Sequence, residues 1–236
     1  MLLISAVHVG FRPNAYGVPA TLGKVLAMAC LCLALVRPAV AGEIEIAAFG
    51  DSLVHGFGLN QGDGLVPQLN RWLAERDAGA TVSNAGVSGD TSAGGLARID
   101  WTLSTDPDAL ILALGSNDLL RGTAPEVSRR NLDAIMARIT QAGIPVLLVG
   151  QEAPLNYGIE YKQQFEAVFP EVATLYDALY YPRIFTALER GLSREKAREL
   201  YMQEDGIHPN AAGVTLIVSD LGPWILRLID TARAGF

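Results

Sequence analysis

The sequence contains little cysteine and little histidine. Its 236 residues include two cysteines, Cys30 and Cys32, and three histidines. Both cysteines lie in an apolar run near the amino terminus. A chain processed beyond that run has no disulfide, no thiolate nucleophile and no cysteine-based metal site. Histidine chemistry in the rest of the chain must then use His55 or His208.

Internal repeats, low-complexity segments and basic stripes are also absent from the sequence. Half of the residues are hydrophobic and 18% are charged, which is typical of one globular domain with a sizeable core. Residues 1–41 contain three basic residues and no acidic ones. The remainder has 15 Lys and Arg (18 minus 3) against 25 Asp and Glu, a net charge of −10. We expect such a body to repel nucleic acid and anionic membrane surfaces.

Residues 1–41 have the organisation of an export signal. Lys24 precedes the apolar run VLAMACLCLALV, and Ala39 and Ala41 occupy the small-residue positions before a cleavage point. The run is short for a bilayer span, and an uncleaved anchor or a buried core helix is the alternative. We therefore predict cleavage after Ala41. The mature chain, residues 42–236, would have no stable membrane insertion and a periplasmic or secreted location.

Apolar segments of strand length alternate with helical patterns along the mature chain. The strand-like segments are 44–49, 81–84, 109–114, 146–150 and about 174–179. The helical patterns are 65–76, 93–103, 125–142, 160–169, 193–202 and 211–229. Because several strand-like segments are apolar throughout, the pattern predicts a single α/β domain with a parallel sheet covered on both faces.

Five polar, glycine-bearing loops follow the predicted strands or precede the last helix. They read GDSLVHG, NAGVSGDTSAGG, GSNDLLRG, QEAPLNYG and EDGIHPNAAG. Sites in open parallel sheets form at the carboxyl ends of the strands. We therefore expect these loops to gather along one edge of the sheet.

Ser52, in the first of these loops, is a candidate nucleophile. A serine hydroxyl needs an adjacent base, and the base needs an orienting group. His208 and Asp205 can supply both from one loop, whereas His55 is too close to Ser52 in sequence to point back easily. The alternative for His208 is a solvent-facing histidine in an ordinary turn.

Two other loops contain candidate hydrogen-bond donors for an oxyanion. Gly89 could offer its backbone N–H to a ligand, and Asn117 could offer its side-chain amide. The alternatives are a turn glycine and a helix-capping asparagine. We interpret Asp51 and Asp118 as structural ties within their loops.

These loops resemble the sequence blocks of the SGNH (GDSL-type) hydrolases, a family named for serine, glycine, asparagine and histidine. The blocks read FGDSL, NAGVSGDTSAGGLAR, LGSNDLLRG and MQEDGIHPN, and they occur in the family order over about residues 46–212. Two further stretches, APLNYG and YKQQFEAVFPEVA, are similar to the bacterial branch that contains periplasmic thioesterase I, also described as a protease and lysophospholipase, and the arylesterases.

The resemblance implies a three-layer α/β/α sandwich of flavodoxin-like fold, with a five-stranded parallel sheet of order 2-1-3-4-5. It implies Ser52 as nucleophile, His208 as base and Asp205 as the group that orients the base. The implied oxyanion hole comprises the backbone N–H groups of Ser52 and Gly89 and the side chain of Asn117. No metal and no organic cofactor are expected.

The implied function is hydrolysis of small carboxylic esters or thioesters, of aryl ester, acyl thioester or lysophospholipid type, through an acyl-enzyme on Ser52. A carbohydrate O-deacetylase with the same triad is the alternative. Two others are a non-catalytic flavodoxin-like binding protein and a catalytically inactive homologue. Residues 151–152 and 180–203 depart from the family pattern, which leaves the natural substrate open.

Overall fold

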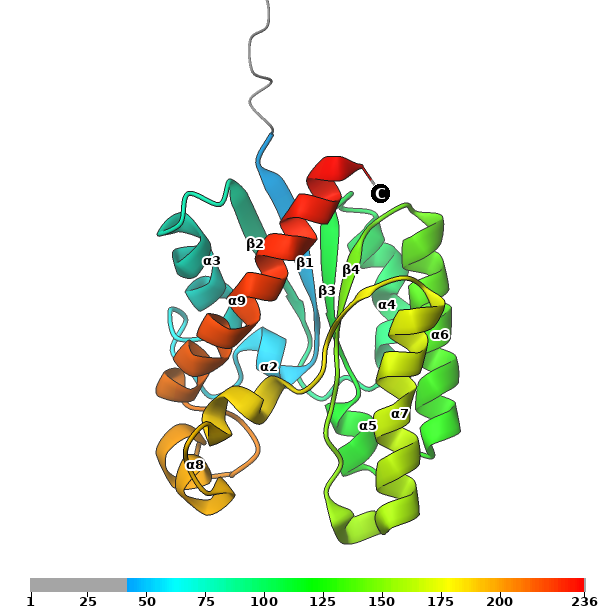
Figure 1. Cartoon of the computed structure of the whole chain (residues 1–236). Coiled ribbons are helices and arrows are strands. Elements are labelled where there is room, and N and C mark those ends of the chain that lie inside the picture. Colours follow the sequence, from blue (N-terminus) through cyan, green and yellow to red (C-terminus); the bar gives the residue numbers. More distant parts are fainter. Residues whose placement is uncertain (1–41, 236) are drawn as a thin grey trace, which may run out of the picture. The chain divides into compact units, whose positions relative to one another are not determined.

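The computed structural model describes residues 42–235, which contain one five-stranded sheet (Figure 1). Its strand order is β2-β1-β3-β4-β5, and every neighbouring pair is parallel, which confirms the predicted order. The strands are β1 (Ile44–Gly50), β2 (Ala80–Gly86), β3 (Ala109–Ala113), β4 (Val146–Val149) and β5 (Leu179–Tyr181). The export signal predicted at residues 1–41 lies outside the described residues.

Helices cover both faces of the sheet, because strand side chains alternate between two apolar clusters. Along β1, Ile46 and Ala48 belong to one cluster, and Ala47 and Phe49 belong to the other. The first cluster is completed by α3 (Leu65–Ala74) and α9 (Ala211–Ala234). The second is completed by α4 (Ser92–Leu103), α6 (Pro125–Gln141) and α7 (Ile159–Leu175). Figure 1 shows these two groups of helices on opposite sides of the sheet, which confirms the three layers.

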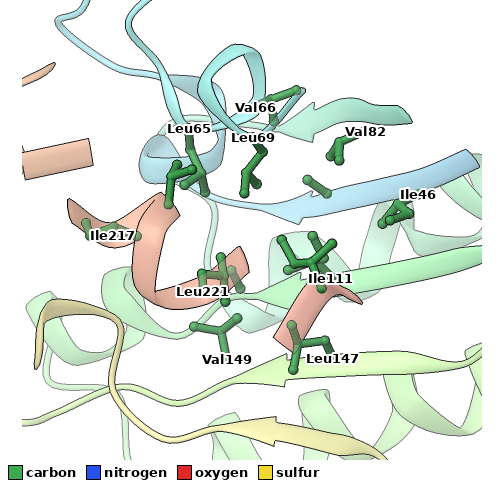
Figure 2. Packing of buried hydrophobic residues seen from close by; sticks show 14 of the residues in the cluster. Ile46, Leu65, Val66, Leu69, Val82, Ile111, Leu147, Val149, Ile217 and Leu221 are labelled. Atoms are coloured by element: carbon green, nitrogen blue, oxygen red, sulfur yellow. The ribbon is translucent and has the colours of Figure 1, made fainter. Parts of the chain in front are cut away.

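Figure 2 shows part of the first cluster. Leu65 and Leu69 of α3 and Leu221 of α9 face strand residues such as Ile46 and Ile111, and all five are at most 1% exposed. Burying a side chain of this size contributes roughly 1.5–3 kcal/mol relative to leaving it in water. This packing holds α3 and α9 against the sheet.

α9 is the one helix within residues 42–235 that could cross a membrane by length and composition. Half of its most apolar stretch is buried inside the protein. Nine of its residues are buried, so its apolar side chains belong to the core of the domain.

The predicted strand at about 174–179 is wrong in its position. The predicted helix 160–169 continues as α7 to Leu175, with Pro170 inside it, and the strand begins only at Leu179. Val172 and Ala173 are buried on the same helical face as Phe169. The free energy gained by packing this face therefore outweighs the loss of the one backbone hydrogen bond that Pro170 cannot donate.

Shorter helices lie in the connections that follow the strands at their carboxyl ends. They are α2 (Ser52–His55), α5 (Ser116–Leu120), η1 (Leu155–Tyr157), η2 (Ile184–Glu189) and α8 (Arg194–Tyr201). In Figure 1 these elements gather at the lower end of the sheet, where β1, β3 and β4 terminate. This is the edge at which the polar loops were expected.

Candidate active site

The five polar loops meet at one cavity of about 330 Å³ at the carboxyl edge of the sheet. All of the predicted site residues except Asp205 line this cavity. Its lining includes Ser52, Gly89, Asn117 and His208. His55 ends α2 with an exposed side chain and does not line the cavity.

Ser52 is presented by a tight connection between β1 and α2. β1 ends at Gly50, where a Cβ atom would lie 2.6 Å from the carbonyl oxygen of Ala113, so the turn requires glycine. Asp51 caps α2, because its side chain accepts a hydrogen bond from the Leu53 N–H at 3.1 Å. Ser52 is thereby the first residue of α2, at the end of a buried strand.

Asp51 itself is 2% exposed, and its Oδ2 atom has no hydrogen-bond partner within the described residues. Burial raises the pKa of its carboxyl group, although the N–H of Leu53 and the nearby His208 oppose the rise. The cap of α2 is consistent with the structural tie predicted for Asp51.

The structure brings together Ser52, His208 and Asp205. The Nδ1 atom of His208 lies 2.6 Å from Oδ2 of Asp205, and Nε2 lies 2.8 Å from Oγ of Ser52. Since an ionised carboxylate only accepts hydrogen bonds, Nδ1–H donates to Asp205 and Nε2 accepts from the serine hydroxyl. The ring of Phe57 packs against the His208 ring, with 4.8 Å between centroids.

Asp205 is held in its ionised form. Burial alone would raise its pKa, but the hydrogen bonds from the His208 ring, from the backbone N–H groups of His208 and Ile207, and the charge of His208 lower it to about 2. The two backbone bonds measure 2.9 Å from Ile207 and 3.0 Å from His208, both to Oδ1. The carboxylate is therefore available to orient an imidazole and to balance its positive charge.

The loop between α8 and α9 is closed on itself. The backbone N–H of Gln203 donates to the carbonyl of His208 at 2.8 Å, and that of Asn210 donates to the carbonyl of Tyr201 at 2.8 Å. Gly206 has φ +63°, a conformation that favours glycine. The Asn210 side chain then caps α9 by accepting the N–H of Gly213. This closure fixes Asp205 and His208 relative to the core helix α9.

The three predicted oxyanion donors belong to residues that line the cavity, Ser52, Gly89 and Asn117. Gly89 has φ +83°, and its carbonyl accepts a hydrogen bond from Arg121 at 2.8 Å. Neither its backbone N–H nor that of Ser52 donates to any group within residues 42–235. The Asn117 amide, on α5, donates to the carbonyl of Asp90 at 2.9 Å, which ties it to the Gly89 loop.

Asp118 joins the loops that hold these donors. Its side chain is 1% exposed and accepts from the backbone N–H of Ser92 at 2.7 Å, from the Ser92 hydroxyl at 2.5 Å and from the Ser128 hydroxyl at 3.1 Å. The start of α4 is thereby fastened to α5 and α6. Asp118 therefore has a structural role, but it ties α5 to α4 and α6, whereas the prediction was a tie within its own loop.

Arg98, on α4, is a site-forming residue that the sequence reasoning missed. Its guanidinium donates to Asp90 Oδ2 at 2.5 Å and to the carbonyls of Ala85 and Gly50 at 2.8 Å each. It also stacks over the ring of Phe49, with 4.0 Å from Cζ to the centroid. One side chain therefore links the ends of β1 and β2 to the Gly89 loop. The signal in the sequence is a lone arginine within the quoted block NAGVSGDTSAGGLAR.

Metal ligands form no comparable group. Among residues 42–235, no three His, Cys, Asp or Glu side chains are arranged so that they could hold a metal ion.

Comparison with known proteins relates the whole domain to one family. Residues 48–216 match the sequence profile of the GDSL-like Lipase/Acylhydrolase family. Esterase TesA of Pseudomonas aeruginosa is 34% identical over 206 residues, which cover 87% of this chain and 98% of that protein. Thioesterase 1/protease 1/lysophospholipase L1 of Escherichia coli K12 is 33% identical over 202 residues, covering 85% of this chain and 91% of that protein.

Solved structures agree with this relationship. The crystal structure of TesA superimposes with a TM-score of 0.70 at 34% identity, covering 78% of this chain and 99% of that one. The esterase AlinE4, of the SGNH-hydrolase family, gives a TM-score of 0.65 at 37% identity, covering 80% of this chain and 98% of that one. The chain belongs to the GDSL-like Lipase/Acylhydrolase family, the SGNH hydrolases, and is a carboxylic ester hydrolase.

Proposed function

We propose that the protein is an exported serine esterase that hydrolyses small carboxylic esters or thioesters through an acyl-enzyme on Ser52. The observation that carries this proposal is the unbroken line of contacts from Asp205 through His208 to Ser52, at 2.6 Å and 2.8 Å. A serine, a base and an ionised orienting group within hydrogen-bond reach are the parts that nucleophilic catalysis by serine requires.

In the acylation step, Ser52 Oγ attacks the carbonyl carbon of the ester while its proton moves to Nε2 of His208. The resulting oxyanion accepts hydrogen bonds from the backbone N–H groups of Ser52 and Gly89 and from the Asn117 amide. His208 then gives its proton to the leaving oxygen or sulfur as the bond to the carbonyl carbon breaks. Asp205 stays anionic and stabilises the imidazolium.

Deacylation repeats these steps with water as the nucleophile. His208 takes a proton from the water as its oxygen attacks the acyl carbon, and the same three donors hold the second oxyanion. The proton then returns to Ser52 Oγ as the acyl bond breaks. The products are a carboxylic acid and the free enzyme.

An acyl or aryl substrate is favoured by the walls of the cavity. Several apolar side chains line it beside Ser52, among them Phe57, Leu119, Leu120 and Ile207. Burying the hydrocarbon part of a substrate against these side chains stabilises the complex by about 25 cal/mol per Å² of apolar surface removed from water. The related proteins are named esterase, thioesterase, lysophospholipase and arylesterase, which supports the same range of substrates.

The export signal forms part of the proposal. Residues 1–41 would be removed after Ala41, and the hydrolase domain of residues 42–236 would act in the periplasm or outside the cell. The first strand begins at Ile44, so this cleavage would remove no described helix or strand.

The test uses the mature chain and p-nitrophenyl esters from acetyl to palmitoyl, with the Ser52→Ala variant as control. Serine-dependent hydrolysis with a maximum at medium chain lengths would support a thioesterase-like or lipase-like role. Hydrolysis confined to the acetyl ester would favour a carbohydrate O-deacetylase. Activity equal to that of Ser52→Ala on every ester would refute the proposal.

A further inference from the structure

Two charged side chains, Glu152 and Arg183, form part of the wall of the catalytic cavity, and Glu152 is the centre of a larger group of ion pairs. Glu152 follows β4 and lines both the catalytic cavity and a neighbouring cavity of about 610 Å³. Its Oε1 atom lies 3.1 Å from Arg194, 3.2 Å from Arg183 and 3.5 Å from Lys162. Burial raises the pKa of Glu152, but the hydrogen bond from Arg194 and the charges of Arg183, Arg194 and Lys162 outweigh it and lower the pKa. Glu152 is therefore anionic.

Arg183 depends on Glu152 more than the other two cations do. Each of those has a second carboxylate partner, Glu189 for Arg194 at 2.9 Å and Glu166 for Lys162. Within residues 42–235, Glu152 is the one carboxylate that forms an ion pair with Arg183. Removing the charge of Glu152 would leave Arg183 as the cation without an ion pair.

Arg183 also lines the catalytic cavity, and its side chain is 45% exposed. The other titratable residues of the lining are Asp51, Glu152 and His208. Asp51 is buried and His208 is engaged with Asp205. The charge that an incoming substrate meets on this wall is thus set by the pair Glu152–Arg183.

We propose that the Glu152–Arg183 pair is a specificity-determining element that keeps the catalytic cavity selective for uncharged esters. An anionic group on a substrate can pair with Arg183 only by displacing Glu152 or by approaching its carboxylate, and like charges at such distances repel. An uncharged ester meets neither cost. This inference rests on the proposed function, because it concerns the substrate of the same site.

The experiment compares esters that differ by one charge. Methyl 4-acetoxybenzoate and 4-acetoxybenzoate place the charge in the leaving group, and methyl 4-nitrophenyl adipate and 4-nitrophenyl hydrogen adipate place it in the acyl group. The measured quantity is kcat/KM for the anionic ester divided by kcat/KM for its neutral partner. Both pairs are assayed with the mature protein at low and at high salt.

Three variants assign the effect to the pair. Glu152→Gln should raise the ratio about fivefold in at least one substrate pair, the range of a partly exposed ion pair, and high salt should reduce the gain. Arg183→Gln should lower the ratio, because Glu152 then loses this cation. The variant with both substitutions should return close to the wild-type ratio.

Glu189→Gln is the matched control, because it removes the same charge beside Arg194 without lining the catalytic cavity. Its ratio should equal that of the wild type. An unchanged ratio in Glu152→Gln for both substrate pairs, or an equal rise in Glu189→Gln, would overturn the inference. Isothermal calorimetry of the same esters in the Ser52→Ala background measures their dissociation constants without turnover. The ratio of the constants for the anionic and the neutral ester then reports the effect of the charge on binding alone. Absence of hydrolysis alone would therefore refute the proposed function and leave the charge comparison intact.

Discussion

Replacing Arg98 should damage the fold and the oxyanion side of the site together. Its guanidinium is the common partner of Asp90 and of the carbonyls of Gly50 and Ala85. Because the carbonyl of Asp90 in turn accepts a hydrogen bond from the Asn117 amide, the position of Asn117 also depends on Arg98. Arg98→Met keeps much of the apolar stem and removes the charge and all three hydrogen bonds.

The magnitude follows from the burial of the ion pair. The side chains of Arg98 and Asp90 are 19% and 14% exposed, and their atoms approach to 2.5 Å. Breaking a buried pair by removing one partner costs about 3–5 kcal/mol, since the other charge is left uncompensated. Residual water access places Arg98→Met near the lower value, at about 3 kcal/mol of unfolding free energy. For a domain of this size that corresponds to a fall in Tm of about 10 °C.

The assay is urea unfolding of the mature protein followed by circular dichroism, with kcat measured on p-nitrophenyl butyrate below the transition. Arg98→Lys serves as the conservative control, because it keeps the charge beside Asp90 and loses the fork that reaches both carbonyls. Arg98→Met/Asp90→Asn removes both charges and should recover part of the lost stability. We expect kcat to fall in Arg98→Met while KM changes less, since the donors lose their alignment.

A loss of less than about 1 kcal/mol of unfolding free energy in Arg98→Met would refute this reasoning, because an exposed surface salt bridge contributes as much. Equal stability of Arg98→Met and the double variant would also contradict it. That result would mean that leaving the Asp90 carboxylate without its cation does not lower the unfolding free energy.

Three other predictions concern the site directly. Asn117→Ala should lower kcat by about a hundredfold or more with little change in KM, by analogy with the loss of one oxyanion donor; a loss below about fivefold in steady-state kinetics would contradict its proposed role. Asp205 has a pKa of about 2, below its ordinary value of 3.8, so its contribution to stability is complete above about pH 4 and is lost as the pH falls toward 2. The difference in unfolding free energy between wild type and Asp205→Asn should therefore shrink from pH 5 to pH 2.5 in urea titrations, and a constant difference would argue against it. Gly50→Ala should abolish activity or folding, because the added Cβ would lie 2.6 Å from the backbone carbonyl oxygen of Ala113; an active variant of wild-type Tm would show that the turn relaxes.

The strands and most helices of this protein could be predicted from local pattern, because apolar runs and capping residues act over a few positions. Pro125 at the start of α6 is one such signal, and the helix does begin there. The end of α7 could not be predicted in this way. Pro170 indicates a break, and the helix continues only because Phe169 and Val172 are buried against the sheet.

The motifs predicted the identity of the triad residues. Ser52, Asp205 and His208 followed from the chemistry that serine needs and from the family resemblance. Their meeting depends on the parallel sheet and on α9, since Ser52 and His208 are 156 positions apart in sequence. The short spacing of Asp205 and His208, by contrast, already favoured a contact within one loop.

The sequence alone thus determined the alternation of strands and helices and the identity of the chemical groups, because both depend on nearby residues. The tertiary structure decided which distant groups became partners. Arg98 reaches the ends of two strands, and Glu152 pairs with Arg183 in the wall of the catalytic cavity. The physical reason is that charge and hydrogen-bonding capacity belong to a residue, whereas the partner that satisfies them depends on how the whole chain is packed.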